Sequence, residues 1–379
     1  MASSPNRSSR IRDEARPQWP AKCQIVWREE PSAIRNNQGV MGYKTPNTRK
    51  EIQTMFSRGR TGILTIAAIL SAISLLGQQK GQWVPGQMGL NAGVVPDPGF
   101  TYMNMAINYS SDQLNDANGN AVGGVTGNYS FWLDENLFFY VPSQKFLGGH
   151  FASYAAVNFA NGSVTASGPF GLPQFGLNAG GLGLTDTMVV PVVLAWQMDR
   201  LDFNVQEGFA APTGRYTAGA SNNTGSGYWG NHVMTGTTAY LTKNKGTSAS
   251  LFTDWEVHST KSGTDITPGQ AFSIEWGLGQ VLPLDKEFHK LLQFGVIGYD
   301  QWQVSGNRGT YSLPSGAIAS ASGVPYYSVH AIGLQANFIV PRKGLNFFFK
   351  YEAEYMAKAR PEGRTFTFGL SWTLRAPKA

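Results

Sequence analysis

Three side chains at every second position, Asp254, Glu256 and His258, are the residues best suited to chemistry in this sequence. Residues two apart point to the same face of a β-strand, so the three would lie together if the segment is extended, with Glu275 on a neighbouring strand. Carboxylates and an imidazole placed together can bind a metal ion or exchange protons with a substrate. They can also form a charged wall in contact with water, which is the interpretation we favour.

Signature motifs for catalysis give no support to the enzymatic alternative. The five histidines have no metal-binding spacing such as HExxH, and no GxSxG nucleophile elbow occurs. The glycine-rich stretch Gly168–Gly183 lacks the Lys-Ser/Thr pair of a phosphate-binding loop. We therefore expect no catalytic residue, no metal site and no cofactor, while a Ser–His hydrolase in the wall stays an open alternative.

The elements that would position these residues are strands. In the segment 364–375, apolar residues alternate with small or polar ones; they are Phe366, Phe368, Leu370, Trp372 and Leu374. About ten residues with one apolar face can cross a bilayer as a tilted strand. Only a closed barrel pairs every backbone amide there, so the pattern predicts an all-β, antiparallel transmembrane barrel of the outer-membrane type.

Segments with the same period recur along the chain, and we predict about twelve strands. They lie near 100–110, 128–140, 147–160, 186–197, 200–210, 231–242, 248–258, 270–282, 291–303, 325–340, 345–356 and 364–375. Long connections rich in Gly, Asn, Ser and Thr mostly alternate with short ones, as in outer-membrane barrels with both termini in the periplasm. A soluble lipocalin-like barrel or a sandwich is the rival architecture, because alternation only shows one buried and one wet face.

Charged residues within these strands are predicted to face the lumen, because an ionised side chain facing lipid costs about 2–4 kcal/mol at the bilayer midplane. The lumen-facing candidates are Asp202, Asp254, Glu256, His258, Glu275, Lys350, Glu352 and Glu354. Aromatic residues near the strand ends would form girdles at the two membrane interfaces. The girdle candidates are Tyr102, Trp132, Trp196, Trp229, Tyr299, Trp302, Tyr326, Tyr355 and Trp372.

The positive charge of the chain is confined to its beginning. Up to Gly77 there are 12 Lys and Arg against 5 Asp and Glu, whereas the remainder has 18 against 19. The formal net charge of +6 therefore gives no support to a nucleic-acid partner. The single cysteine, Cys23, also lies in this leader, so the rest of the chain forms no disulfide.

The leader contains an apolar run at 61–77 that follows Arg58 and Arg60, as in a secretory signal peptide. Met55 would be its initiator, and a single transmembrane anchor is the alternative. The expected organisation is a disordered extension before the true start at 1–54, a signal peptide at 55–77, a periplasmic N-terminal segment at 78–98 and the barrel at 99–375.

Three stretches, 82–120, 186–216 and 341–374, have distinctive sequences, of which the most specific pieces are PDPG at 96–99 and APTGRY at 211–216. Through them the chain resembles, from about residue 88 to 375, the outer-membrane proteins of the phenol meta-pathway degradation family. The resemblance implies a barrel that passes, or helps to take up, hydrophobic or aromatic compounds. It implies no catalytic residues.

We therefore predict a channel in the bacterial outer membrane for small hydrophobic or aromatic compounds, with outer-membrane lipid and the barrel-assembly machinery as partners. Twelve strands enclose a narrow lumen that side chains or loops partly fill. Apolar residues of the glycine-rich stretch could form an apolar site in the barrel mouth or pack on one another; they are Phe170, Leu172, Phe175, Leu177 and Leu182. A non-transporting structural or adhesion barrel, or an outer-membrane enzyme, is the alternative.

Overall fold

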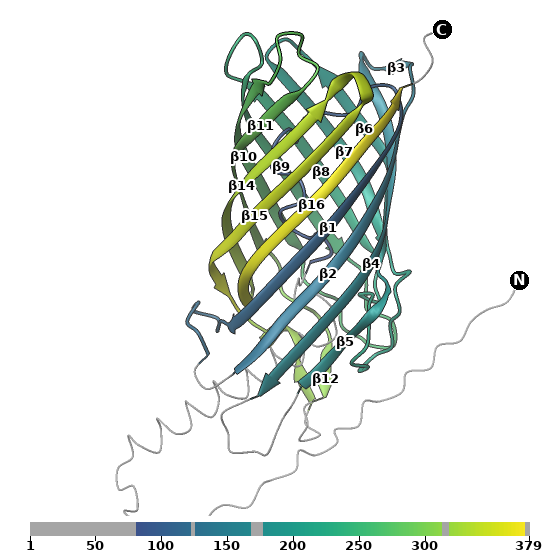
Figure 1. Cartoon of the computed structure of the whole chain (residues 1–379). Helices are drawn as coiled ribbons and strands as arrows, with labels where there is room; N and C mark the ends of the chain where they lie inside the picture. Colours follow the sequence, from purple (N-terminus) through teal and green to yellow (C-terminus); the bar gives the residue numbers. More distant parts are fainter. Residues whose placement is uncertain (1–80, 123–125, 168–176, 313–317, 376–379) are drawn as a thin grey trace, which may run out of the picture. The chain divides into compact units, whose positions relative to one another are not determined.

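Twelve antiparallel strands close into a barrel (Figure 1) in the computed structural model, which describes residues 81–122, 126–167, 177–312 and 318–375. They are β1 (Gly99–Leu114), β2 (Thr126–Val141), β4 (Gly149–Ser167), β6 (Thr187–Gln197), β7 (Leu201–Ala211), β8 (Gly230–Tyr240), β9 (Thr247–His258), β10 (Ala271–Pro283), β11 (Leu291–Gln303), β14 (Ser328–Val340), β15 (Leu345–Lys358) and β16 (Pro361–Arg375). The sheet closes because β1 pairs with both β2 and β16, and β2 pairs in turn with β4. The predicted fold and all twelve strand positions are confirmed.

The two ends of the barrel differ in their connections. Short turns join the strands at one end, which lies at the top of Figure 1 and includes β3 (Lys145–Phe146) and the 3-10 turn η2 (Pro341–Lys343). Longer connections lie at the other end, with the small hairpin of β12 (Thr310–Ser312) and β13 (Ile318–Ser320) and the 3-10 turn η1 (Ala321–Gly323). We call these the short-turn end and the long-loop end. The link 359–360 is the exception, since only two residues join β15 to β16 at the long-loop end.

One predicted loop is partly sheet. The region 161–185 was expected to be an irregular connection, but β4 continues to Ser167 and pairs with β5 (Leu177–Leu184). Glycine makes this pairing sterically possible, because a Cβ on Gly180 would collide with the carbonyl oxygen of Gly162. The glycine-rich composition therefore serves a close strand contact.

The outer surface carries exposed aromatic side chains, as predicted for most of the girdle candidates. Trp132, Trp229 and Tyr355 are each more than half exposed. Tyr299 is a correction, because its side chain is buried and its hydroxyl donates to Glu354 at 3.0 Å on the inside of the barrel.

Asp134 departs from the rule that charged residues face inward. It lies on the outer face of β2, where the Asn104 side-chain amide donates to its carboxylate at 2.6 Å. The neighbouring amide replaces part of the solvation that the carboxylate would find in water. Within the described residues, no helix is long and apolar enough to cross a membrane.

Candidate functional site

The inner wall of the barrel has two chemically different halves. One is formed by β1, β2, β4 and β6, and we call it the apolar half. Its buried inward side chains are Met105, Ile107, Tyr109, Tyr129, Phe131, Leu133, Leu137, Ala152, Tyr154, Ala156, Ala160, Val190 and Val193. The polar half comprises the remaining strands, β7–β11 and β14–β16. Its buried polar side chains include Asp202, Asn204, Gln206, His232, Ser250, Asp254, Glu256, Glu275, Gln293, Gln301, Gln335, Asn337, Lys350, Glu352 and Glu354.

Residues 81–98, the N-terminal segment, lie inside the barrel against the polar half (Figure 1). At the long-loop end the Gln82 side chain donates to Ser226 and to the carbonyl of Tyr228. Near the short-turn end the Gly93 amide donates to Thr238 at 2.9 Å. The segment was expected in the periplasm, outside the barrel. The structure corrects this, because the backbone groups of this non-repetitive stretch find their hydrogen-bond partners on the inner wall.

Glu275 is the central anchor of the N-terminal segment. Its carboxylate accepts hydrogen bonds from the Trp83 indole at 2.8 Å, the Gly86 amide at 3.0 Å and the Met88 amide at 2.7 Å. Three donors on one buried carboxylate replace the water that it loses on burial. Glu275 thereby fixes both the path of the segment and the orientation of Trp83.

Neighbouring charged groups extend this anchor. Glu256 accepts from the backbone amides of Gln82 and Trp83 at 2.6 and 3.2 Å. Lys350 donates to the carbonyls of Gly86 and Gln87 at 2.9 and 2.5 Å. The backbone bends at Gly86, where φ is +93° and a Cβ would collide with a carboxyl oxygen of Glu352. The acidic side chains accept hydrogen bonds from backbone amides of the segment, and Lys350 donates to its backbone carbonyls. Side chains of the polar half therefore provide the hydrogen bonds that a neighbouring strand would provide in a sheet.

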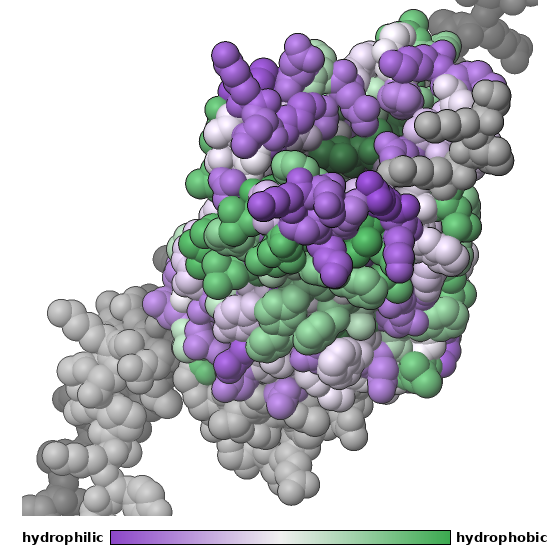
Figure 2. Space-filling view, turned by 45° about the horizontal axis from the view of Figure 1, so that its top comes forward, coloured by the Kyte–Doolittle hydropathy of each residue, from purple (hydrophilic) through white to green (hydrophobic). Residues whose placement is uncertain are grey.

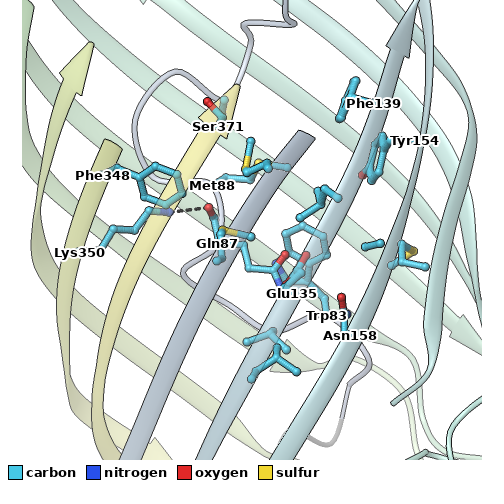
Figure 3. Close-up of a pocket in the computed structure, with 18 of the residues that line it drawn as sticks. Trp83, Gln87, Met88, Glu135, Phe139, Tyr154, Asn158, Phe348, Lys350 and Ser371 are labelled. Carbon is cyan, nitrogen blue, oxygen red and sulfur yellow. Dashed lines mark hydrogen bonds between the residues drawn. The ribbon is translucent and has the colours of Figure 1, made fainter. Parts of the chain in front are cut away.

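The apolar half stays uncovered and borders a cavity of about 420 Å³ (Figure 3). On the wall side its lining includes Met105, Phe131, Leu133, Leu137, Phe139, Tyr154 and Met188. The N-terminal segment contributes Trp83, Met88 and Leu90 among others, and strands of the polar half add further side chains. These include Asn204, Gln206, Gln335, Asn337, Phe348 and Lys350. A cavity of this volume and apolar character is of the size that binds small organic molecules.

The cavity extends along the barrel. Its lining runs from Thr185 and Ser226 at the long-loop end to Pro96 and Thr373 at the short-turn end. The space-filling view toward the short-turn end shows a hollow with a hydrophobic floor inside a hydrophilic rim (Figure 2). The N-terminal segment therefore fills one side of the lumen and leaves an apolar passage along the other.

The apolar half is interrupted by Thr101 on β1, whose hydroxyl donates to Thr373 at 2.9 Å, and by two further polar side chains. Glu135 on β2 and Asn158 on β4 are direct partners in the antiparallel register, and both line the cavity. Glu135 is 3% exposed, and its Oε2 has no hydrogen-bond partner within the described residues; the same holds for Oδ1 of Asn158.

At the long-loop end of the cavity lies a second acidic group, Asp186, in the connection that precedes β6. Its carboxylate accepts from the backbone amides of Ser226 at 2.8 Å and Gly214 at 3.2 Å. Burial raises the pKa of Asp186 above its ordinary value, although the hydrogen bonds from Ser226, Gly214 and Gln82 act in the opposite direction. These bonds connect the loop 212–229 to the start of the N-terminal segment.

All eight lumen-facing candidates are buried, but they serve different contacts and only Lys350 lines the cavity. Asp202 accepts from the Tyr240 hydroxyl at 2.6 Å. Glu354 forms an ion pair with Arg360 at 3.1 Å and also accepts from the hydroxyls of Tyr109 and Tyr299.

The candidate metal or acid–base residues are only partly brought together. His232, which the sequence analysis did not select, joins Asp254 and Glu256, with one potential ligand atom from each within 4.8 Å of the others. His232 Nδ1 lies 3.1 Å from the Asp254 carboxylate, while Glu256 binds His258 and the N-terminal segment. The donor types suit a divalent cation, but the same oxygens also hold the segment in place.

The predicted apolar loop site lies mostly outside the described residues. Phe170, Leu172 and Phe175 lie outside the described residues, as does the side chain of Leu177. Leu182 on β5 is 70% exposed and is absent from the cavity lining.

The sequence analysis also missed Glu135 and the apolar half as a whole. The available signal was the run FWLDENLFFY at 131–140, in which apolar residues occupy both alternating sets of positions. Such a strand has an apolar inner face as well as an apolar outer face.

The barrel is similar to solved outer-membrane proteins. The COG4313 outer membrane channel from Pseudomonas putida F1 has a TM-score of 0.56 and 14% identity, covering 77% of this chain and 100% of that chain. A TodX deltaS2S3 mutant, described as a monoaromatic hydrocarbon channel, has a TM-score of 0.42 and 10% identity, covering 75% and 92%. The β domain of the Bordetella autotransporter BrkA has a TM-score of 0.39 and 12% identity, covering 73% and 100%.

Among curated proteins no match was found. A family model matches residues 111–370, which is more than half of the chain. The resemblance noted in the sequence is thereby confirmed, and the chain belongs to the family described as the putative MetA-pathway of phenol degradation.

Proposed function

We propose that this protein is an outer-membrane channel that admits small hydrophobic or aromatic molecules along the apolar half of its lumen. The observation that carries the proposal is the elongated cavity between the N-terminal segment and that half. Its lining favours solutes that lose little hydration on entry, because burying apolar surface is favourable and burying unpaired polar groups is costly. The family description, which refers to phenol degradation, is consistent with such solutes.

The passage runs beside the N-terminal segment. Glu275 and Glu256 together accept five hydrogen bonds from residues 82–88, which makes displacement of the segment costly. An apolar solute that follows the opposite wall leaves these bonds intact. Charged or strongly hydrated solutes would meet aromatic and aliphatic side chains along the same route.

The proposal includes an orientation. The short-turn end faces the periplasm, in agreement with the loop pattern of outer-membrane barrels, and lipid contacts the aromatic outer surface. Residues 55–77 serve as the signal peptide that delivers the chain to the barrel-assembly machinery. Because residue 82 contacts Ser226 near the opposite mouth, a mature chain that begins after residue 77 would start only a few residues before this contact.

Narrowing the passage tests the proposal. Ala156 is 2% exposed and lines the cavity from β4, whereas its neighbour Ala155 is on the outer face of the same strand. In proteoliposomes, Ala156→Phe should reduce toluene uptake to a small fraction of the wild-type rate, and Ala155→Phe should leave it unchanged. Heat-modifiable migration on a gel checks that both variants fold. Equal uptake by both folded variants would contradict passage along the apolar half.

A further inference from the structure

Glu135 is a carboxyl group in a wall that is built mainly from apolar side chains. Along β2 its inward neighbours are Leu133 and Leu137, and its direct partner on β1 is Met105. Its partner on β4 is Asn158, which also lines the cavity. Among the described residues, neither of these two side chains is part of an ion pair.

No contact within the described residues explains why these two polar side chains are buried in a mainly apolar wall. Oε2 of Glu135 and Oδ1 of Asn158 are buried without a hydrogen-bond partner within the described residues. The nearest basic group on the cavity wall is Lys350, whose ammonium group is committed to the carbonyls of Gly86 and Gln87. An unsatisfied buried polar group costs about 1–3 kcal/mol, and a leucine at either position would avoid that cost. Such groups in a ligand-sized cavity are the usual means of fixing a ligand's orientation.

We propose that Glu135 and Asn158 bind the hydroxyl group of a small, uncharged ring compound and so give the channel a preference for phenols over hydrocarbons of the same size. This inference rests on the proposed channel function and adds a recognition point to it. The hydroxyl donates its single proton to Oε2 of Glu135 or to Oδ1 of Asn158, while the ring packs against Met105, Leu133 and Leu137. Figure 3 shows both polar side chains on one side of the cavity, close to Trp83.

The charges around the cavity select this ligand class. An anionic solute would lose its hydration in this wall and find no free cationic group, because Lys350 is committed to the carbonyls of Gly86 and Gln87. A cationic solute would have to pass the ammonium group of Lys350, which lines the same cavity. A neutral molecule with one hydroxyl donor satisfies one of the two unpaired acceptors and brings no charge of its own.

The experiment compares phenol with toluene, which carries a methyl group in place of the hydroxyl. Binding to the folded, full mature protein in detergent is measured by equilibrium dialysis with radiolabelled phenol or toluene. Glu135→Leu should weaken phenol binding about tenfold, which corresponds to one hydrogen bond of about 1.4 kcal/mol, and leave toluene binding within about twofold. Asn158→Leu should act in the same direction with a smaller effect.

Asp134→Leu is the matched control, because Asp134 precedes Glu135 but lies on the outer face of β2. It should leave the binding of both compounds unchanged. Glu135→Gln keeps the size and an acceptor, and should weaken phenol binding about fivefold if Glu135→Leu fails to fold.

The two proposals fail in different ways. If wild-type protein binds both compounds and no folded variant at Glu135 or Asn158 changes their affinity ratio, the recognition point is overturned and the channel proposal stands. If wild-type protein binds neither phenol nor toluene, the cavity has no such ligands and both proposals fall.

Discussion

The two halves of the inner wall have the same strand architecture and opposite chemistry. On β9 and β10 the inward positions carry Asp254, Glu256 and Glu275, and the N-terminal segment covers them. On β1 and β2 the inward positions carry mostly methionine, leucine and aromatic residues, and a cavity faces them. The N-terminal segment forms hydrogen bonds with the charged groups of the polar half. Without the segment, these groups would be in contact with water and would line an aqueous pore. The uncovered half then determines which solutes can pass.

Deleting residues 81–95 should leave both halves of the inner wall uncovered and give the largest change in conductance. The charged groups of the polar half would be exposed to water, and single-channel conductance in planar bilayers should rise by roughly tenfold, because a lumen of twelve strands is otherwise occluded by the segment. Removing residues 260–266 from a loop at the long-loop end is the control and should leave conductance near the wild-type value. An unchanged conductance after the first deletion would mean that the segment does not limit the pore.

Glu354→Gln should show that some charged groups of the polar half stabilise the barrel and do not hold the N-terminal segment that blocks the lumen. Glu354 and Arg360 form a fully buried ion pair, and Glu354 also accepts from Tyr109, Tyr299 and the Gly363 amide. Among the described residues, Glu354 itself makes no hydrogen bond to the N-terminal segment, which the network reaches only through Gln301. Removing one charge leaves the other unpaired, so the free energy of unfolding in urea should fall by about 3–5 kcal/mol. The same change at exposed Glu287 should have no measurable effect. A rise in conductance without loss of stability would assign Glu354 to the occlusion instead.

Glu275→Gln should loosen the N-terminal segment without unfolding the barrel. The three donors from Trp83, Gly86 and Met88 would lose their charged acceptor, at a cost of about 1–3 kcal/mol. Amide hydrogen exchange of residues 83–88 should become faster, while exchange in β1 and β16 stays slow. Uniformly faster exchange over the whole barrel would indicate a general loss of stability and would contradict a local anchor.

The barrel could be predicted from the sequence because its determinant is local. Alternation such as that of 364–375 fixes a strand and its two faces, and twelve such segments leave few other architectures. The N-terminal segment could not be placed in this way, since 82–98 has no periodicity. Its position depends on side chains such as Glu256 and Glu275, which lie more than a hundred residues away in sequence.

The cavity was missed for a second physical reason. Polar inward positions such as Glu275 stand out against an apolar outer face, but 131–140 is apolar on both faces, and the pattern then no longer shows which face is the lumen. Closure of the sheet decides this, because it places Phe131 and Leu133 inside and Trp132 outside. Glu135 and its exposed neighbour Asp134 are likewise distinguished only by the register of the closed barrel.

A mild change on the apolar half gives the smallest expected effect and tests whether its apolar character matters in itself. Met105→Gln keeps the length of a side chain that is 3% exposed and lines the cavity, but adds an amide to a wall with few partners for it. Toluene uptake should fall by about two- to fivefold, since about 0.5–1 kcal/mol of favourable apolar contact is lost along the route. Met356→Gln, at a position 41% exposed, is the control. If both substitutions leave uptake unchanged, the volume of the passage limits transport and the chemistry of its wall does not.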